Sequence, residues 1–136
     1  MDKIFNAISI IGGIVGGVCV RIFGGWDAML WALAICMVLD YISGIIKAIY
    51  NKELSSEISF KGLLRKVVIL IVVALSNVVQ TFVGQNIPIR EIVIVFYVVN
   101  EGISILENTA VVYPKIPEEL KEVLLQLRGS KDDDIS

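Results

Sequence analysis

The sequence predicts an all-α membrane protein with three to four transmembrane helices and a short C-terminal amphipathic helix. Hydrophobic residues make up 56% of the 136 residues and charged residues 19%, whereas soluble domains average about 45–50% and about 25%. The mean hydropathy is +0.79. Several long stretches contain few or no charges, as membrane-spanning helices do. Together these three observations define the fold class.

The composition also excludes several functional classes. An apolar chain is not intrinsically disordered, and a net charge of −2 argues against a basic nucleic-acid-binding protein. The absence of histidine excludes imidazole-based zinc sites and histidine-based catalysis. Cys19 and Cys36 lie in apolar stretches without C-x-x-C spacing, and the sequence shows no nucleophile–base arrangement. We therefore expect no enzymatic activity, no cofactor, no metal and no nucleic-acid partner.

The first predicted span covers residues 4–23. Its apolar part, Ile4–Val20, contains 17 uncharged residues, which is short for a hydrocarbon core of about 30 Å. Two overlapping G-x-x-x-G pairs, which let helix backbones approach closely, provide the helix-packing candidates Gly12, Gly13, Gly16 and Gly17. Two alternatives stay open: a signal peptide, although no A-x-A-like cleavage site follows, and a helix lying along the membrane surface. The number of spans is therefore three or four.

Three further spans are predicted at residues 26–49, 67–89 and 92–113. The third span contains 23 residues without an ionisable group, which is about 34 Å of helix. The apolar part of the second span, Ala28–Ile46, is interrupted by Asp40, and the fourth span carries Glu101 and Glu107. Residues 1–113 thus form the predicted transmembrane domain.

The basic residues predict the orientation of the chain, because loops rich in Lys and Arg stay in the cytoplasm. With four spans, ten basic residues lie on one side, and two, Arg21 and Arg90, lie on the other. The connector between the second and third spans holds the topology determinants Lys47, Lys52, Lys61, Arg65 and Lys66. We therefore expect this connector and the C-terminus in the cytoplasm. With three spans the side of the N-terminus is left open.

Residues 114–128 are predicted to form an amphipathic helix on the cytoplasmic side. Leu120, Val123, Leu124 and Leu127 recur at i, i+3, i+4 and i+7 and share one face. Such a face rests on the membrane surface or on a neighbouring helix. Residues 129–136 are polar and acidic, and we expect them to be disordered.

Polar residues inside the predicted spans form a stripe on each of three helices. An ionisable residue in a span costs roughly 2.5–3.5 kcal/mol, so the stripes indicate specific packing or function. The candidates for lining a pore or forming these stripes are Asp40, Ser43, Lys47, Asn77, Gln80, Asn100, Glu101, Ser104, Glu107 and Asn108. Gly44, a further packing candidate, and Lys47 share the helix face of Asp40, so Lys47 is able to approach its carboxylate. Either the stripes satisfy each other inside one bundle or they line water, and a rearranging assembly allows both.

Three segments carry a resemblance to a known family: W-D-A-M-L-W-A-L-A-I-C-M-V-L-D-Y-I-S-G-I-I-K-A-I at Trp26–Ile49, the polar connector at Leu54–Lys66, and N-E-G-I-S-I-L-E-N at Asn100–Asn108. In these segments the chain resembles the toxin-secretion/phage-lysis holin family (holin family 4) of Gram-positive phages, which includes the clostridial toxin-release holin. The resemblance covers most of Trp26–Leu127. It implies a protein of the bacterial cytoplasmic (inner) membrane that oligomerises into large lesions, releases an endolysin or toxin, and so causes host cell lysis.

The resemblance also implies the partners, which are other copies of the chain and membrane lipids. An endolysin or toxin would pass as cargo without stable binding. A folded enzyme of about 250 residues has a diameter of roughly 45 Å. Helices about 10 Å apart around such a hole number about 15 to 20, so one or two helices per subunit require roughly ten to twenty subunits.

Two alternatives to a holin stay open at this point. A small proton-coupled multidrug or ion transporter also combines short spans with an intramembrane carboxylate. The charge-rich connector of about 20 residues and the acids clustered at Asn100–Asn108 argue against it. An antiholin regulator would share every feature of the sequence described above.

Overall fold

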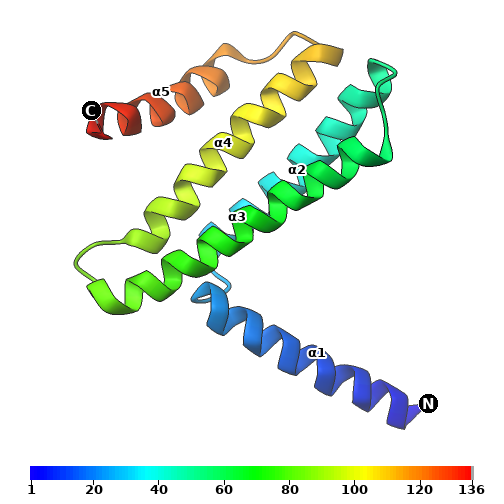
Figure 1. Cartoon of the computed structure of the whole chain (residues 1–136), viewed down its shortest axis with the longest axis vertical. Helices are drawn as coiled ribbons and strands as arrows, with labels where there is room; N and C mark the ends of the chain where they lie inside the picture. The colour runs from blue at the N-terminus through cyan, green and yellow to red at the C-terminus, as the bar shows by residue number, and fades with distance from the viewer. Residues whose placement is uncertain (136) are drawn as a thin grey trace.

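The computed structural model describes the backbone of residues 1–135 and the side chains of residues 1–129. Over this part the chain is helical, without strands, which confirms the expected all-α fold class (Figure 1). The helices are α1 (Asp2–Phe23), α2 (Ala28–Tyr50), α3 (Ser56–Val83), α4 (Ile89–Val112) and α5 (Glu118–Ile135).

Capping residues account for the helix boundaries. The side chain of Asp27 accepts a hydrogen bond from the Leu30 amide at 3.0 Å and begins α2, and Ser55 begins α3 in the same way. Helix α3 ends at Val83 and is capped by Gly84, whose positive φ of 72° is a conformation that glycine adopts without strain. Compared with the expected span 67–89, α3 therefore begins eleven residues earlier and ends before the turn that precedes Pro88.

Helices α2, α3 and α4 form an antiparallel bundle in which α4 packs extensively on α2 and also contacts α3 (Figure 1). Leu33, Val73 and Ile94, one from each helix, are fully buried at its centre. Around them lie Leu30, Met37 and Ile69. This small apolar core holds the three helices together between two polar clusters.

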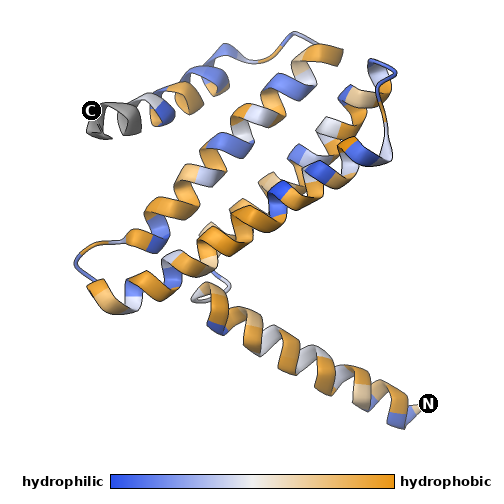
Figure 2. Cartoon of the chain, in the orientation of Figure 1, coloured by the Kyte–Doolittle hydropathy of each residue, from blue (hydrophilic) through white to orange (hydrophobic). Residues whose placement is uncertain are grey.

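Helix α1 extends away from the bundle, and none of its residues is buried (Figure 1). Figure 2 shows hydrophobic residues on the visible turns along its length. No atom lies within 4 Å of the position that a Cβ would take at the predicted packing glycines Gly12, Gly13, Gly16 and Gly17. Their role in packing therefore needs a second helix that a single chain does not supply, and it stays a prediction.

Three of the described helices, α1, α2 and α3, are long and apolar enough to cross a membrane. Helix α4 is not among them, and its sequence carries Arg90, Glu91, Glu101 and Glu107. The expected span at 92–113 therefore stays a prediction, although a helix of suitable length is present.

Helix α5 folds back along α4 (Figure 1). A Cβ at Gly102 of α4 would lie 3.3 Å from the methyl carbons of Leu124, so the glycine makes room for that leucine. Helix α5 is longer than the expected segment 114–128, because Gly129 keeps a helical backbone and the helix continues to Ile135. It thus enters the segment 129–136 that was expected to be disordered, of which Ser136 lies outside the described residues.

Candidate functional site: a buried ionic triad

One lysine joins two carboxylates from different helices inside the bundle. The Nζ atom of Lys66 on α3 donates hydrogen bonds to Oδ2 of Asp40 on α2 and to Oε2 of Glu101 on α4. The three side chains are 10%, 12% and 7% exposed. The Asp40–Lys66–Glu101 triad therefore links all three helices of the bundle through one ammonium group.

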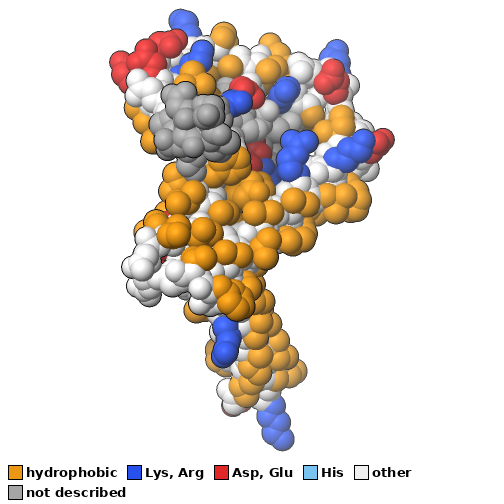
Figure 3. Space-filling view, turned by 60° about the vertical axis from the view of Figure 1, so that its left-hand side comes forward, with side chains coloured by type: hydrophobic (Ala, Val, Ile, Leu, Met, Phe, Trp, Pro, Cys, Tyr) orange, Lys and Arg blue, Asp and Glu red, His pale blue; other side chains and the backbone are white. Residues whose placement is uncertain are grey.

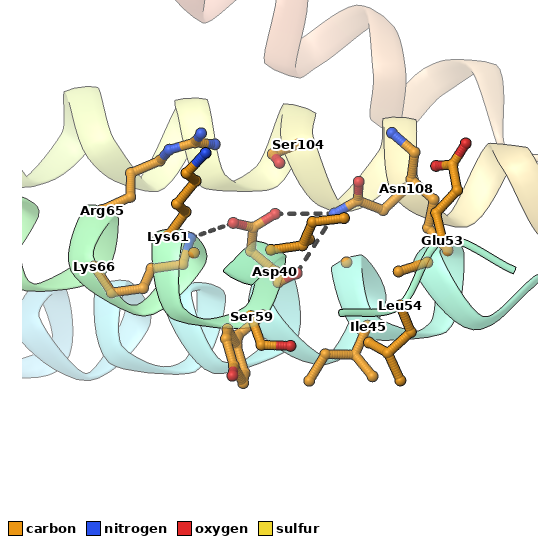
Figure 4. Close-up of a pocket in the computed structure, with 16 residues that line it drawn as sticks. Asp40, Ile45, Glu53, Leu54, Ser59, Lys61, Arg65, Lys66, Ser104 and Asn108 are labelled. Atoms are coloured by element: carbon orange, nitrogen blue, oxygen red, sulfur yellow. Dashed lines mark hydrogen bonds and ion pairs between the residues drawn. The ribbon is translucent and has the colours of Figure 1, made fainter. Parts of the chain in front are cut away.

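Amide and hydroxyl groups complete the surroundings of Asp40. Asn108 of α4 donates through Nδ2 to Oδ1 of Asp40 at 3.1 Å (Figure 4). The same nitrogen donates to the Ser43 hydroxyl at 3.1 Å. The Ser43 hydroxyl in turn donates to the backbone carbonyl of Asp40. Both carboxylate oxygens of Asp40 are thus hydrogen-bonded. A Cβ at Gly44 would lie 3.7 Å from the Asn108 amide nitrogen, an ordinary contact, so the role of Gly44 in helix packing stays a prediction.

The helix positions explain why these residues meet. Asp40 and Glu101 are each the thirteenth residue of their helix, and α2 and α4 run in the same direction (Figure 1). At about 1.5 Å per residue, both carboxylates lie about 18 Å from the start of their helices. Lys66 lies about 15 Å from the start of the antiparallel α3. The triad therefore lies near the middle of the bundle, far from either end.

Burial makes the triad sensitive to the loss of any member. Taking charges out of water is costly, and their mutual attraction offsets this only when hydrogen bonds satisfy the remaining polar atoms. No buried side-chain nitrogen or oxygen is left without a partner among the described residues. Removing one member of such a set leaves an uncompensated charge and costs about 3–5 kcal/mol. The stability of the bundle thus depends on the three charges being present together.

A second polar cluster lies at the end of the bundle where α1 meets α2. Arg90, 5% exposed, donates to the Asp27 carboxylate at 2.8 Å, to the Phe23 carbonyl at 2.6 Å and to the Gly25 carbonyl at 3.0 Å. Hydrogen bonds from Arg90 and from the Leu30 amide lower the pKa of Asp27. Arg90 therefore attaches the turn between α1 and α2 to the first turn of α4.

Helix α3 contributes two amides to this Arg90 cluster. Asn77 donates to the carbonyls of Arg21 and Ile22 in the last turn of α1, at 3.2 and 3.0 Å. Gln80 donates to the Ile87 carbonyl and accepts from the Arg90 amide at 3.1 Å. The C-terminal end of α1 and the α3–α4 turn are therefore tied to the same residues.

The structure divides the predicted polar stripes between separate places. Asp40, Ser43, Glu101 and Asn108 meet at the triad, Asn77 and Gln80 belong to the Arg90 cluster, and Lys47 and Ser104 line a cavity beside the triad. Asn100 is half-buried and Glu107 exposed, and neither takes part in the hydrogen bonds of the two clusters. The stripes therefore meet inside the bundle, but not as one continuous line.

Two lysines lie differently from the positions that the sequence suggests. Lys66, expected in the basic connector with Lys52, Lys61 and Arg65, lies inside α3 because this helix begins ten residues earlier, at Ser56. Lys66 takes the place beside Asp40 that Lys47 was expected to approach. Arg90 was counted only as a basic residue on the side opposite the connector, whereas the structure buries it. A signal for its role was the acidic residue Asp27 two positions after Gly25, in a turn whose carbonyl groups accept hydrogen bonds from Arg90.

Long apolar helices that enclose a small apolar core and a buried ionic triad are typical of α-helical membrane proteins. More specifically, residues 17–129 match the bacteriophage holin family, and the chain belongs to this family. Membership indicates a non-enzymatic membrane protein.

Similar proteins occur in several Gram-positive bacteria and in a phage. An uncharacterized 14.9 kDa protein from the nagH 3′ region of Clostridium perfringens is 40% identical over 96% of this chain and 100% of its own length. An uncharacterized protein of Listeria innocua is 39% identical over 97% of this chain and 93% of its own length. A probable holin of Bacillus phage phi105 is 35% identical over 70% of each chain. No solved structure matches the chain.

Proposed function

We propose that this protein is a holin that accumulates in the bacterial cytoplasmic membrane and assembles there into lesions that release an endolysin or toxin. Its membership in the bacteriophage holin family and its similarity to the probable holin of phage phi105 support this proposal. In this proposal the α2–α3 connection and the C-terminus face the cytoplasm.

The distribution of charge supports this orientation. Figure 3 shows charged side chains gathered at the end of the bundle that holds the α2–α3 and α4–α5 connections, with a mainly hydrophobic surface on the bundle below. Lys52, Lys61 and Arg65 are exposed near this end. Basic residues at one end of a set of spans favour the cytoplasmic side.

The Asp40–Lys66–Glu101 triad is the observation that carries the mechanism. In the compact bundle the three charges satisfy each other and meet little water. If subunits reassociate so that the triad faces water, the charges regain hydration and no longer hold α2, α3 and α4 together. The polar face would then line the lesion, and the apolar faces would meet lipid.

The rest of the chain fits an assembly of many copies. Helix α1 has no buried residue, and large side chains such as Ile8, Ile11 and Ile14 are 60–63% exposed. These surfaces have lipid or a neighbouring subunit as natural partners. A hole wide enough for a folded enzyme requires roughly ten to twenty subunits, each lending one or two helices.

Timed expression in a bacterial host, with and without a co-expressed endolysin, tests the proposal. A holin gives abrupt lysis that needs both proteins and releases a large cytosolic enzyme into the medium. A transporter would instead support substrate uptake while the cells remain viable. Steady growth with both proteins present, or lysis without the hydrolase, would contradict the proposal.

A further inference from the structure

A cavity of about 350 Å³ opens beside the triad and reaches toward the α2–α3 connection. Its walls come from α2, α3, α4 and the turn at Glu53 and Leu54 (Figure 4). Asp40 and Lys66 lie at its inner end. The volume is at the lower end of the range for ligand sites, about 300–1,000 Å³.

Positive charge predominates around this cavity. Four cations, Lys47, Lys61, Arg65 and Lys66, line it against two carboxylates, Asp40 and Glu53. Lys66 is paired with Asp40 and Glu101, and Lys61 with Glu57 at 2.8 Å.

Two of the four cations have no anionic partner among the residues whose side chains the structure describes. Lys47 is half-buried and Arg65 exposed, and neither takes part in an ion pair among the described residues. Figure 4 shows the side chain of Arg65 extending from α3 toward α4. Since these two cations approach the cavity from different helices, an anion in the cavity would be contacted from two sides.

An apolar groove adjoins the charged cavity and shares Tyr41, Ile45 and Leu54 with it. Phe60 and Leu63 extend this groove along α3, with exposures of 60% and 51%. The occupant that fits both features carries a negative head and an apolar tail. Basic pockets between membrane-spanning helices on the cytoplasmic side bind anionic lipid headgroups for this reason.

We propose that the cavity binds the headgroup of an anionic phospholipid, with its phosphate at Lys47 and Arg65 and an acyl chain along Tyr41, Phe60 and Leu63. The lipid would connect α2 and α3 at the end of the bundle that the apolar core does not reach. Lipid binding at this site does not require lysis activity, so it can be measured on the purified chain.

Native mass spectrometry of the detergent-solubilised full chain, titrated with phosphatidylglycerol or with phosphatidylcholine of the same acyl chains, tests this proposal. We expect the first phosphatidylglycerol to bind at least about tenfold more tightly than phosphatidylcholine, because it alone carries a net negative charge. The double variant Lys47→Gln/Arg65→Gln should lose this preference. The matched control Lys52→Gln/Lys115→Gln removes two exposed cations outside the cavity and should retain it.

A second variant tests the cavity itself without a change of charge. Gly62 lines the cavity, and a Cβ there would lie 3.6 Å from the Tyr41 ring, an ordinary contact, so the larger side chain of Gly62→Leu starts beside Tyr41 and takes up space in the cavity. It should weaken binding of phosphatidylglycerol while the variant keeps its helical circular dichroism. Competition with glycerol phosphate and with inorganic phosphate distinguishes a site for a lipid headgroup from a site for free phosphate.

Three results would overturn the proposal. An equal loss of the preference for phosphatidylglycerol in the control double variant would show that the lipid responds to the overall surface charge and not to this cavity. Displacement of the lipid by inorganic phosphate at comparable concentration would show a site for free phosphate. Unchanged binding in both Lys47→Gln/Arg65→Gln and Gly62→Leu would place the lipid elsewhere. None of these results bears on lysis, so failure of this proposal is distinguishable from failure of the proposed function.

Discussion

Arg90 and Asp27, which are 63 residues apart in the chain, form an ion pair with 2.8 Å between Nη1 and Oδ2. The pair joins the first turn of α4 to the cap of α2, and the same guanidinium holds the carbonyls of Phe23 and Gly25. Together with Asn77, which binds the Arg21 and Ile22 carbonyls, this side chain holds the end of α1 against the bundle. At the middle of the bundle Lys66 has a corresponding role, since it holds three helices together.

Replacing Arg90 by glutamine should lower the free energy of unfolding by about 1–3 kcal/mol, because the half-buried residues Phe23 and Gly25 lose the donor to their carbonyl groups. Unfolding in detergent, followed by circular dichroism, measures the change. Arg21→Gln is the matched control, since the Arg21 side chain is exposed and its backbone carbonyl remains available to Asn77. Equal effects of the two substitutions would show that the Arg90 contacts add no stability.

The ion pair should also make stability depend on pH in the acidic range. The pKa of Asp27 in the folded chain is lowered by its hydrogen bonds from Arg90 and the Leu30 amide. The contribution of Asp27 to the free energy of unfolding is therefore complete above the unfolded pKa of about 3.9. This contribution is lost as the pH falls through the lower pKa of the folded chain. Asp27→Asn should flatten the decline of the unfolding midpoint below about pH 4. A variant with the same acid profile as the wild type would contradict this assignment.

The left-handed turn at Gly24 should tolerate no side chain. Its φ is +81°, and a Cβ there would lie 2.3 Å from the Asn77 side-chain oxygen and 2.9 Å from Nε of Arg90. Gly24→Ala should therefore destabilise the chain by at least about 1 kcal/mol. Gly16→Ala on α1 should instead stabilise its helix, because nothing lies within 4 Å of the new Cβ and alanine favours helix more than glycine does. Thermal unfolding of both variants provides the comparison.

Lys66 and Lys61 offer a direct comparison of a buried and an exposed lysine on one helix. Lys66→Met leaves two carboxylates facing each other and should cost about 3–5 kcal/mol. Lys61→Met breaks an exposed pair with Glu57 and should cost less than about 1 kcal/mol. The triple variant Asp40→Asn/Lys66→Met/Glu101→Gln should recover most of the loss, because no unpaired charge remains. No recovery would mean that packing of the lysine stem, and not charge, accounts for the effect.

The triad should control when lysis occurs more strongly than how much protein accumulates. Asp40→Asn and Glu101→Gln each weaken the connection between helices and should bring lysis forward when an endolysin is present. Culture density over time gives the onset, and immunoblots of the membrane fraction give the amount of protein. If both variants accumulate normally and lyse on the wild-type schedule, the triad has no part in triggering.

Much of the fold follows from local sequence. Uncharged stretches, the caps Asp27 and Ser55, and the glycines at 24 and 84 define where the helices lie, because these effects act within a few residues. The boundaries of α3 were harder to predict. Its first three turns are polar, so hydropathy alone places the start of the span at 67, although the Ser55 cap begins the helix before it.

The contacts among the polar residues could also be predicted only in part. Their presence in the spans indicated that they pack specifically, and Asp40, Glu101 and Asn108 do meet. Which lysine joins them depends on the antiparallel register of α3, a long-range feature. Lys47, seven residues from Asp40 on its own helix, was the nearer choice in sequence, but its side chain lines the cavity instead.

By itself the sequence determined an all-α membrane protein of the holin family, the positions of its apolar helices and the end at which its basic residues gather. The family follows from the resemblance of short sequence segments, and the other properties depend on composition and on periodicity within single helices. Tertiary structure decided that Lys66 lies inside the bundle, that Arg90 holds the base of α1, and that Lys47 and Arg65, which form no ion pair among the described side chains, face one cavity. The reason is physical: charges inside a bundle must be paired, and the partner is whichever residue the packing of the helices brings within reach.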